Sequence, residues 1–140
     1  MPEARSNSAP RTILVVDDEP FVLSCLTGIL QLAGFTVLSA GSPEEALRIG
    51  ISLETGIDLM ICDVVMPRLP GPALADEFEV IHPETRWLFI AGLPDHPAVH
   101  EHIINRGRAF LAKPFFPREL LAKVNDVLSG TQRRSMAAGA

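Results

Sequence analysis

The sequence predicts an α/β fold built on one parallel sheet, because strand-like and helix-like segments alternate five times along its 140 residues. The gap after each strand-like run leaves room for one helix. Runs 12–16 and 59–63 are almost wholly apolar, which is typical of central strands covered on both faces. The predicted strands are Thr12–Val16, Thr36–Ala40, Leu59–Asp63, Trp87–Ala91 and Arg108–Ala112.

The first two predicted helices have recognisable ends. The first stops near Gly34, because glycine favours the residue after a helix. The second begins with a capping-box pattern, Ser42-Pro43-Glu44-Glu45, and runs to about Leu53. The apolar stripe predicted to face the core in the first helix is Phe21, Val22, Cys25, Leu26, Ile29 and Leu30.

The other three helices are predicted from apolar periodicity, over residues 71–82, 97–106 and 117–129. The helix at 97–106 has the poorest apolar stripe of the five. The residues predicted to line the inner face of the helix at 71–82 are Leu74, Phe78 and Ile81.

Composition and charge restrict the class of protein. At 47% hydrophobic and 21% charged, the chain has the composition of an ordinary globular domain. A net charge of −5 argues against nucleic-acid partners, and no apolar stretch reaches the ~18 residues of a membrane span. Cys25 and Cys62 are expected to be reduced and buried. We expect a cytoplasmic protein, with flexible tails at 1–10 and 130–140 around one domain at 11–129.

Reactive side chains follow three of the strand-like runs, namely Asp17-Asp18, Asp63 and Lys113. The carboxyl ends of parallel strands meet along one edge, where α/β proteins bind their ligands, so these groups are expected to converge. Crowded carboxylates raise one another's pKa unless a cation neutralises them. Because Mg²⁺ prefers oxygen ligands at open sites and binds phosphates, we predict a Mg²⁺ site at this edge.

The charges of this site suit phosphoryl acceptance. Three carboxylates, one lysine and Mg²⁺ sum to zero formal charge. Asp63 is the best candidate nucleophile, because Lys113 and the acidic pair can flank it from neighbouring strands. The alternative is that these residues are ordinary solvated side chains at strand ends, where aspartate is common. This alternative explains each residue singly, but it explains the joint occurrence of all four less well.

Three motifs, in this order, resemble the receiver domain of two-component response regulators, in a stand-alone form similar to the chemotaxis regulators. The resemblance covers about residues 11–129. It implies a flavodoxin-like, doubly wound sheet with strand order 2-1-3-4-5 and helices on both faces. The motifs are Ile13-Leu14-Val15-Val16-Asp17-Asp18-Glu19-Pro20, then Asp58-Leu59-Met60-Ile61-Cys62-Asp63-Val64-Val65-Met66-Pro67 with Gly71, then Lys113-Pro114-Phe115.

The same resemblance implies a role for each residue of the site. Asp63 would be the phosphoacceptor and Lys113 would contact a phosphoryl oxygen. The backbone N–H groups of Val64 and Gly92 would contact the phosphate, and the peptide bond before Pro114 would be cis. The Mg²⁺ ligands would be Asp18, Asp63, the backbone carbonyl of Val65 and, through water, Asp17.

Two positions depart from the family pattern. Receivers usually end the fourth strand with Thr or Ser, whose hydroxyl hydrogen-bonds the phosphoryl group, but here the residue is Ala91. The aromatic switch position is Phe110, which has no hydroxyl either. We therefore expect phosphorylation to survive and conformational coupling to be weaker. Phe115 and Phe116 are expected either to form a partner surface or to lie in the core.

The expected function is acceptance of a phosphoryl group from a histidine kinase or a histidine phosphotransfer protein, without enzymatic turnover. Output would pass to a downstream protein partner, or through a homodimer across the fourth and fifth helical faces. One alternative is a degenerate receiver that binds proteins without phosphorylation, which Ala91 favours. A phosphatase of the haloacid dehalogenase class would need a second aspartate where the chain has Val65.

Overall fold

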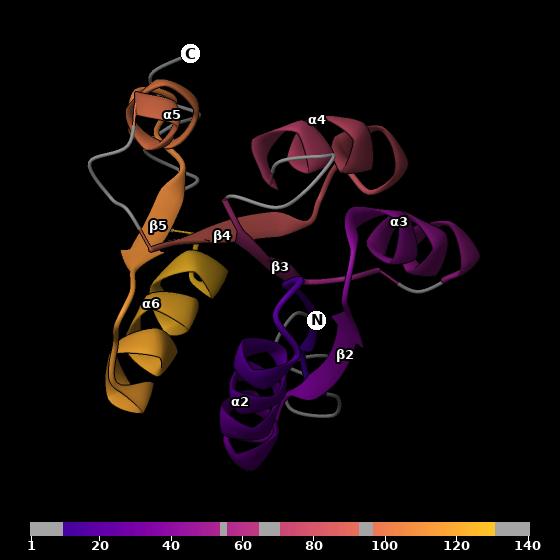
Figure 1. Cartoon of the computed structure of the whole chain (residues 1–140). Helices are drawn as coiled ribbons and strands as arrows, with labels where there is room; N and C mark the ends of the chain where they lie inside the picture. The colour runs from indigo at the N-terminus through magenta and orange to yellow at the C-terminus, as the bar shows by residue number, and fades with distance from the viewer. Residues whose placement is uncertain (1–9, 54–55, 65–70, 93–96, 131–140) are drawn as a thin grey trace.

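The computed structural model describes residues 10–53, 56–64, 71–92 and 97–130. Its centre is a five-stranded sheet, in which every neighbouring pair of strands is parallel, with the order β2-β1-β3-β4-β5 (Figure 1). The predicted α/β class and strand order are therefore confirmed. The strands are β1 (Thr12–Val16), β2 (Thr36–Ala40), β3 (Leu59–Asp63), β4 (Arg86–Ala91) and β5 (Ala109–Ala112).

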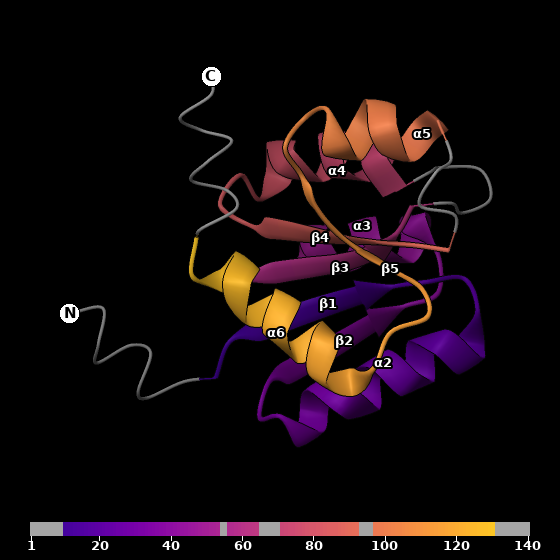
Figure 2. The same cartoon turned by 90° about the vertical axis from the view of Figure 1, so that its left-hand side faces the viewer.

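Helices cover both faces of the sheet (Figure 2). Four of the five predicted helices end within about two residues of their expected bounds. The helices are α2 (Pro20–Leu32), α3 (Pro43–Ser52), α4 (Gly71–Ile81), α5 (Pro97–Val99), the π-helix η1 (His100–Ile104) and α6 (Pro117–Leu128). Within the described ranges, none is long and apolar enough to cross a membrane.

The helix predicted over 97–106 differs from expectation. Its first turn, α5, continues into the π-helix η1, where the Asn105 N–H donates to the carbonyl of His100 at 2.9 Å. Of the three residues in its apolar stripe, Val99 and Ile103 are buried, whereas Ile104 is 40% exposed. Apolar periodicity records which residues face the core, but it does not distinguish an i+4 from an i+5 hydrogen bond in a segment with so weak a stripe.

Alternating side chains of each strand pack into two separate clusters. Leu14 and Val16 face the cluster under α3, α4 and η1, while Ile13 and Val15 face the cluster under α2 and α6. Phe78 of α4 lies in the first cluster, fully buried. This alternation orients the strands rigidly, so the residues that follow them emerge in defined directions at the edge.

Three positions predicted to face the core in α2 and α4 are wrong. Phe21 of α2 is 79% exposed, Cys25 is also exposed, and Ile81 of α4 is 37% exposed. In α2 the apolar residues come in adjacent pairs, and only the second of each pair lies nearest the sheet, as with buried Leu26 and Leu30. A helix that is apolar on several sides does not reveal from sequence which side is covered.

Arg86, at the start of β4, connects the amino-terminal edge of the sheet to the end of α6. Its guanidinium Nη1 donates to the carbonyl oxygens of Leu128 and Val127, the last residues of α6. Gly130 then leaves the helix with a φ of +88°, a conformation that favours glycine. These contacts satisfy helix-end carbonyls that would otherwise lack a donor, and they tie α6 to the sheet.

Candidate functional site

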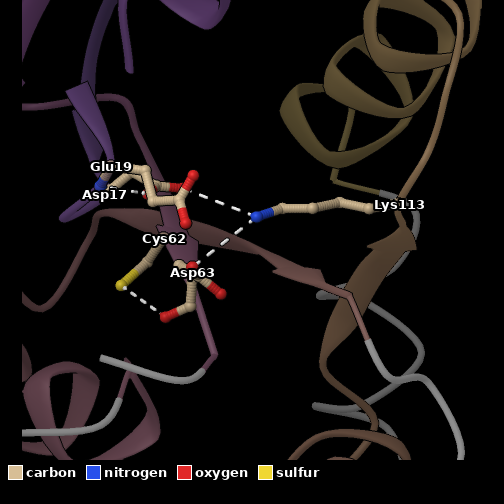
Figure 3. Close-up of polar contacts among 5 residues, drawn as sticks. All are labelled: Asp17, Glu19, Cys62, Asp63 and Lys113. Carbon is tan, nitrogen blue, oxygen red and sulfur yellow. Dashed lines mark hydrogen bonds and ion pairs between the residues drawn. The ribbon is translucent and has the colours of Figure 1, made fainter. Parts of the chain in front are cut away.

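Asp17, Asp63 and Lys113 converge at the carboxyl edge of the sheet (Figure 3). Asp17 follows β1 and Asp63 ends β3, and the pairing of Val16 with Cys62 puts the two residues at one level. Lys113 follows β5, and its N–H donates to the carbonyl of Ala91 at 2.8 Å. The side chain of Lys113 extends from β5 toward the two carboxylates on the far side of β4.

The lysine ammonium lies between the two carboxylates. Lys113 Nζ is 3.6 Å from Asp63 Oδ2 and 3.8 Å from Asp17 Oδ2. Asp18 is exposed beside them, and one carboxylate oxygen from each of the three aspartates lies within 4.8 Å of the others. The predicted convergence of the three acids and the lysine is thus present in the structure.

Asp17 carries an electrostatic cost, because its carboxylate is buried. It is 1% exposed, its Oδ1 accepts the Glu19 N–H at 2.9 Å, and its Oδ2 accepts no hydrogen bond from the residues that the structure describes. Burial raises the pKa of Asp17, as do the charges of Asp63 and Asp18, whereas the Glu19 N–H and Lys113 lower it. A buried oxygen without a donor, grouped with two more carboxylates, fits a hard divalent cation.

Cys62 directly precedes Asp63 in β3 and is buried. Its Sγ donates to the backbone carbonyl of Asp63 at 3.4 Å. Burial raises the pKa of the Cys62 thiol well above its usual range, and the charges of Asp63 and Asp17 add to this effect. The thiol therefore stays neutral and serves as packing and as a weak hydrogen-bond donor rather than as a nucleophile.

Gly71 allows α4 to begin against the backbone of Asp63. Its N–H donates to the carbonyl of Val64 at 3.0 Å, and a Cβ at this position would lie 2.4 Å from the carbonyl oxygen of Asp63. Such a separation is far below van der Waals contact, so no side chain fits without displacing the strand end. The motif in the sequence includes this glycine, but the reason for it appears only when the helix is packed against β3.

The remaining predicted site residues have varied surroundings. The Val64 N–H donates to the carbonyl of Ile90 at 2.9 Å, so its contact with a phosphate stays a prediction. Gly92 is exposed, and a Cβ there would meet nothing within 4 Å. The Lys113–Pro114 peptide bond is cis. Val65 lies outside the described residues.

The two residues without hydroxyl groups adjoin one apolar cluster. Ala91 is 2% exposed and belongs to the cluster that contains Val99 and Ile103, and Phe110 is partly buried against the same cluster. Nearby, Phe115 packs against the cluster on the other face, whereas Phe116 is 58% exposed with the Arg118 guanidinium 4.8 Å from its ring centre. Phe115 therefore takes the expected core position, whereas a partner surface at Phe116 stays a prediction.

We predict that Gly71→Ala lowers the free energy of unfolding by about 1–3 kcal/mol, because the new methyl group forces the α4 terminus away from Asp63. Urea denaturation measures the change. Gly28→Ala is the matched control, since a Cβ at Gly28 meets nothing within 4 Å and alanine favours a helix. Unchanged stability in Gly71→Ala would contradict the close packing described.

We also predict that Asp17→Asn stabilises the metal-free protein at neutral pH. Because the pKa of Asp17 is raised, the folded state keeps this proton to a higher pH than the unfolded state does. The free energy of unfolding therefore falls as the pH rises from about 4 through the raised pKa. Asparagine keeps an oxygen that can accept the Glu19 N–H. Because asparagine does not titrate, this decrease in the free energy of unfolding should be absent in the variant.

Thermal unfolding in EDTA between pH 4 and 8 tests the second prediction. The melting temperature of Asp17→Asn should exceed that of the wild type by a margin that grows with pH. Asp126→Asn changes an exposed carboxylate on α6 and should show no such growing margin. A margin that shrinks toward neutral pH would show that the charge of Asp17 stabilises the fold.

Comparison with known proteins agrees with this fold. Residues 13–125 match the response regulator receiver domain family. The sensor kinase CckA of Brucella abortus is 33% identical over 126 residues, which are 90% of this chain and 13% of that protein. The probable transcriptional regulator ycf27 of Cyanidium caldarium is 32% identical over 133 residues, which are 95% of this chain and 52% of that protein.

A solved structure has the same architecture. The receiver domain protein from Clostridium thermocellum is 29% identical with a TM-score of 0.75, and the match covers 91% of this chain and 98% of that one. By contrast, the chain spans about half or less of the two curated relatives. The match over residues 13–125, together with the strand order and the acidic edge, means that the chain belongs to the receiver domains of two-component response regulators.

Proposed function

We propose that Asp63 accepts a phosphoryl group from a phosphohistidine, carried by a histidine kinase or a histidine phosphotransfer protein, in a reaction that requires Mg²⁺. The observation that carries this proposal is the position of Lys113 Nζ, 3.6 Å from Asp63 Oδ2 and 3.8 Å from Asp17 Oδ2. The Asp63 side chain is 12% exposed, so its carboxylate is held by the protein and still open to a donor.

The transfer is a displacement at phosphorus. A carboxylate oxygen of Asp63 attacks and forms the new O–P bond, while the N–P bond of the donor breaks and its electron pair stays on the imidazole nitrogen. Lys113 would donate to a phosphoryl oxygen and offset its charge. Family membership supports a signalling module that keeps its acyl phosphate until hydrolysis, rather than an enzyme with turnover.

The residues that would hold Mg²⁺ are the three aspartates and the carbonyl of Val65. Asp17, Asp18 and Asp63 supply oxygens of the kind that Mg²⁺ prefers. When bound, the ion would neutralise the crowded carboxylates and the oxygens of the phosphoryl group. The buried Oδ2 of Asp17, which accepts no hydrogen bond in the described part of the chain, supports this assignment.

Labelling with acetyl phosphate, followed by intact-mass measurement, tests the proposal. We expect a mass gain of one phosphoryl group in the presence of Mg²⁺, and none in EDTA. Asp63→Asn should abolish the gain, Lys113→Ala should slow it at least about tenfold, and Asp126→Asn should leave it unchanged. Equal labelling of Asp63→Asn, or labelling in EDTA, would reject the site.

We further propose that phosphorylation is only weakly coupled to the fourth helical segment. Ala91 has no hydroxyl that could hydrogen-bond a phosphoryl oxygen, and both Ala91 and Phe110 pack by apolar contact alone. A signal from the site to η1 and β5 would then depend on small shifts in packing. This feature also favours the alternative of a receiver that works chiefly as a binding module.

Ala91→Ser tests the weak coupling, because serine restores a hydroxyl with little added volume. Hydrogen exchange of the η1 and β5 amides is measured with and without phosphorylation. We expect a larger change in Ala91→Ser than in the wild type. Ala91→Cys, similar in size but a poor donor, should resemble the wild type. An equally large change in the wild type and in Ala91→Ser would refute the idea.

A further inference from the structure

The strand β2 lies at one end of the described sheet, where its only neighbour is β1 (Figure 1). At its start, the Thr36 N–H donates to the carbonyl of Arg11 at 3.0 Å. Because the backbone groups of a strand point alternately to its two sides, those of Thr36 and Leu38 are directed at β1. The N–H and C=O groups of Val37 and Ser39 therefore point away from the sheet.

The end of β2 follows the same alternation. The carbonyl of Ala40 accepts the Asp17 N–H at 3.2 Å, so Ala40 is also directed at β1. In the part of the chain that the structure describes, neither Val37 nor Ser39 has a hydrogen-bond partner on the outer side of the strand. These two residues leave a row of open backbone donors and acceptors along the edge.

The β2 edge lacks the features by which proteins usually prevent edge pairing, which are charged side chains, proline and bulges. Its sequence is Thr-Val-Leu-Ser-Ala, and each residue pairs in register with one residue of β1. The opposite edge is different, because Arg108 directly precedes β5 and Lys113-Pro114 follows it. Of the two edges, β2 is therefore the one that can accept a further strand.

Charge favours a second copy of the chain as the source of that strand. Residues 20–43 contain no Asp, Glu, Lys or Arg, although 21% of the chain is charged. This stretch includes α2, β2 and the segments that join them to α3. A net charge of −5 opposes self-association over most surfaces, but two β2 strands would bring no like charges of their own together. A partner recognised through charge would find no complementary group along this strand.

The open groups of β2 are arranged symmetrically about Leu38. If two copies pair antiparallel about a two-fold axis at Leu38, Val37 lies opposite the partner's Ser39. Both residues direct their backbone groups outward, so each can donate to the other and accept from it, as in a hydrogen-bonded pair of an antiparallel ladder. Leu38 then lies opposite the partner's Leu38 as a non-hydrogen-bonded pair. An isologous contact requires this self-complementarity.

The side chains of β2 suit a sheet that continues across the axis. Val37 packs against the cluster under α2 and α6, and Leu38 packs against the cluster under α3, α4 and η1. Both are only partly buried, so pairing would cover apolar surface on both faces of the sheet. From the open backbone groups, the unprotected edge and the symmetric spacing, we infer that two copies of this chain pair through antiparallel β2 strands.

This interface is distinct from the fourth and fifth helical faces expected for a dimer from the resemblance. It uses one strand of five residues from each copy. An interface of that size lies at the small end of specific contacts, so the dimer is weak and reversible. The contact does not depend on phosphorylation of Asp63, because β1 separates β2 from β3.

Sedimentation velocity from about 10 µM to about 1 mM protein tests the pairing. We expect concentration-dependent dimers of the wild type. Ser39→Pro should raise the dissociation constant at least about tenfold, because proline removes an outward N–H from each copy and leaves the hydrogen bonds to β1 in place. Ser39→Ala is the matched control, since it keeps this N–H and changes only an exposed side chain.

Ser39→Lys provides a second variant that keeps the backbone N–H. Lysine on an edge strand opposes pairing, and the two lysines of a dimer would be diagonal neighbours across the axis. We expect the dissociation constant to rise roughly threefold or more. Because the Ser39 side chain is exposed, the melting temperature of Ser39→Lys should equal that of the wild type.

Amide hydrogen exchange at single residues, measured by NMR, provides an independent reading. In the monomer the N–H groups of Val37 and Ser39 face solvent, whereas the Leu38 N–H is directed at β1. Raising the concentration of the wild type should slow exchange at Val37 and Ser39 and leave Leu38 unchanged. Ser39→Ala should behave in the same way, whereas in Ser39→Pro the Val37 amide should exchange equally fast at every concentration.

Three outcomes would overturn the inference. The first is a wild type that stays monomeric throughout the range. The second is a dimer in which the Val37 amide exchanges as fast as in the monomer, or one that Ser39→Pro weakens no more than Ser39→Ala does. The third is a monomer whose Val37 and Ser39 amides are protected only by an added phosphotransfer protein, which would assign the edge to another protein. Acetyl phosphate labelling of Ser39→Lys should equal that of the wild type, so failure here is separable from failure of the proposed function.

Discussion

The parallel pairing of β1 with β3 is the constraint on which the site depends. It sets Val16 beside Cys62, so Asp17 and Asp63 emerge at the same level of the same edge. The pairing then continues through β4 to β5, where Ala91 lies beside Ala112, directly before Lys113. A lysine two strands away from Asp63 can therefore place its ammonium between two carboxylates. A shift of one residue in either pairing would turn these side chains to the other face.

The same convergence makes the edge electrostatically unfavourable without a cation. Asp17 is almost fully buried, and one lysine faces two carboxylates, with Asp18 adjacent. Burial of a charge is tolerated in proteins where it is paired or where it binds a ligand. The raised pKa of Asp17 is the sign of this cost. The proposed divalent ion would offset this cost, because it would neutralise the crowded carboxylates.

The two faces of the sheet relate differently to this edge. On one face, Ala91 and Phe110 adjoin a cluster with η1, so the environment behind the site is apolar and lacks the hydroxyl that is usual in receivers. On the other face, α2 begins a few residues after Asp17, carries no charged residue and exposes Phe21 and Leu32. The individual character of this receiver lies in these two surfaces, whereas its acidic edge follows the family.

The sequence could predict the sheet because apolar runs and the residues that follow them are local signals. Strand positions, the order of elements and the group of Asp17, Asp18, Asp63 and Lys113 could all be read in this way, and the family resemblance supplied the strand order. The exposure of Phe21 and Cys25 could not be predicted, because α2 is apolar on more than one side and only its packing on the sheet selects the inner one. The π-helix could not be predicted either, since apolar periodicity does not indicate which backbone carbonyl accepts the hydrogen bond of a given N–H.

Several features were decided only when distant segments met. The need for glycine at position 71 arises because α4 begins against the Asp63 carbonyl, and the burial of Asp17 arises from strands on both sides of it. The Val64 N–H was expected at the phosphate, but its hydrogen bond to Ile90 depends on β4. The sequence by itself thus determined the kinds of chemical group at the site and their order along the chain. The tertiary structure decided their distances, burial and competing partners, because these depend on contacts between segments that no local pattern encodes.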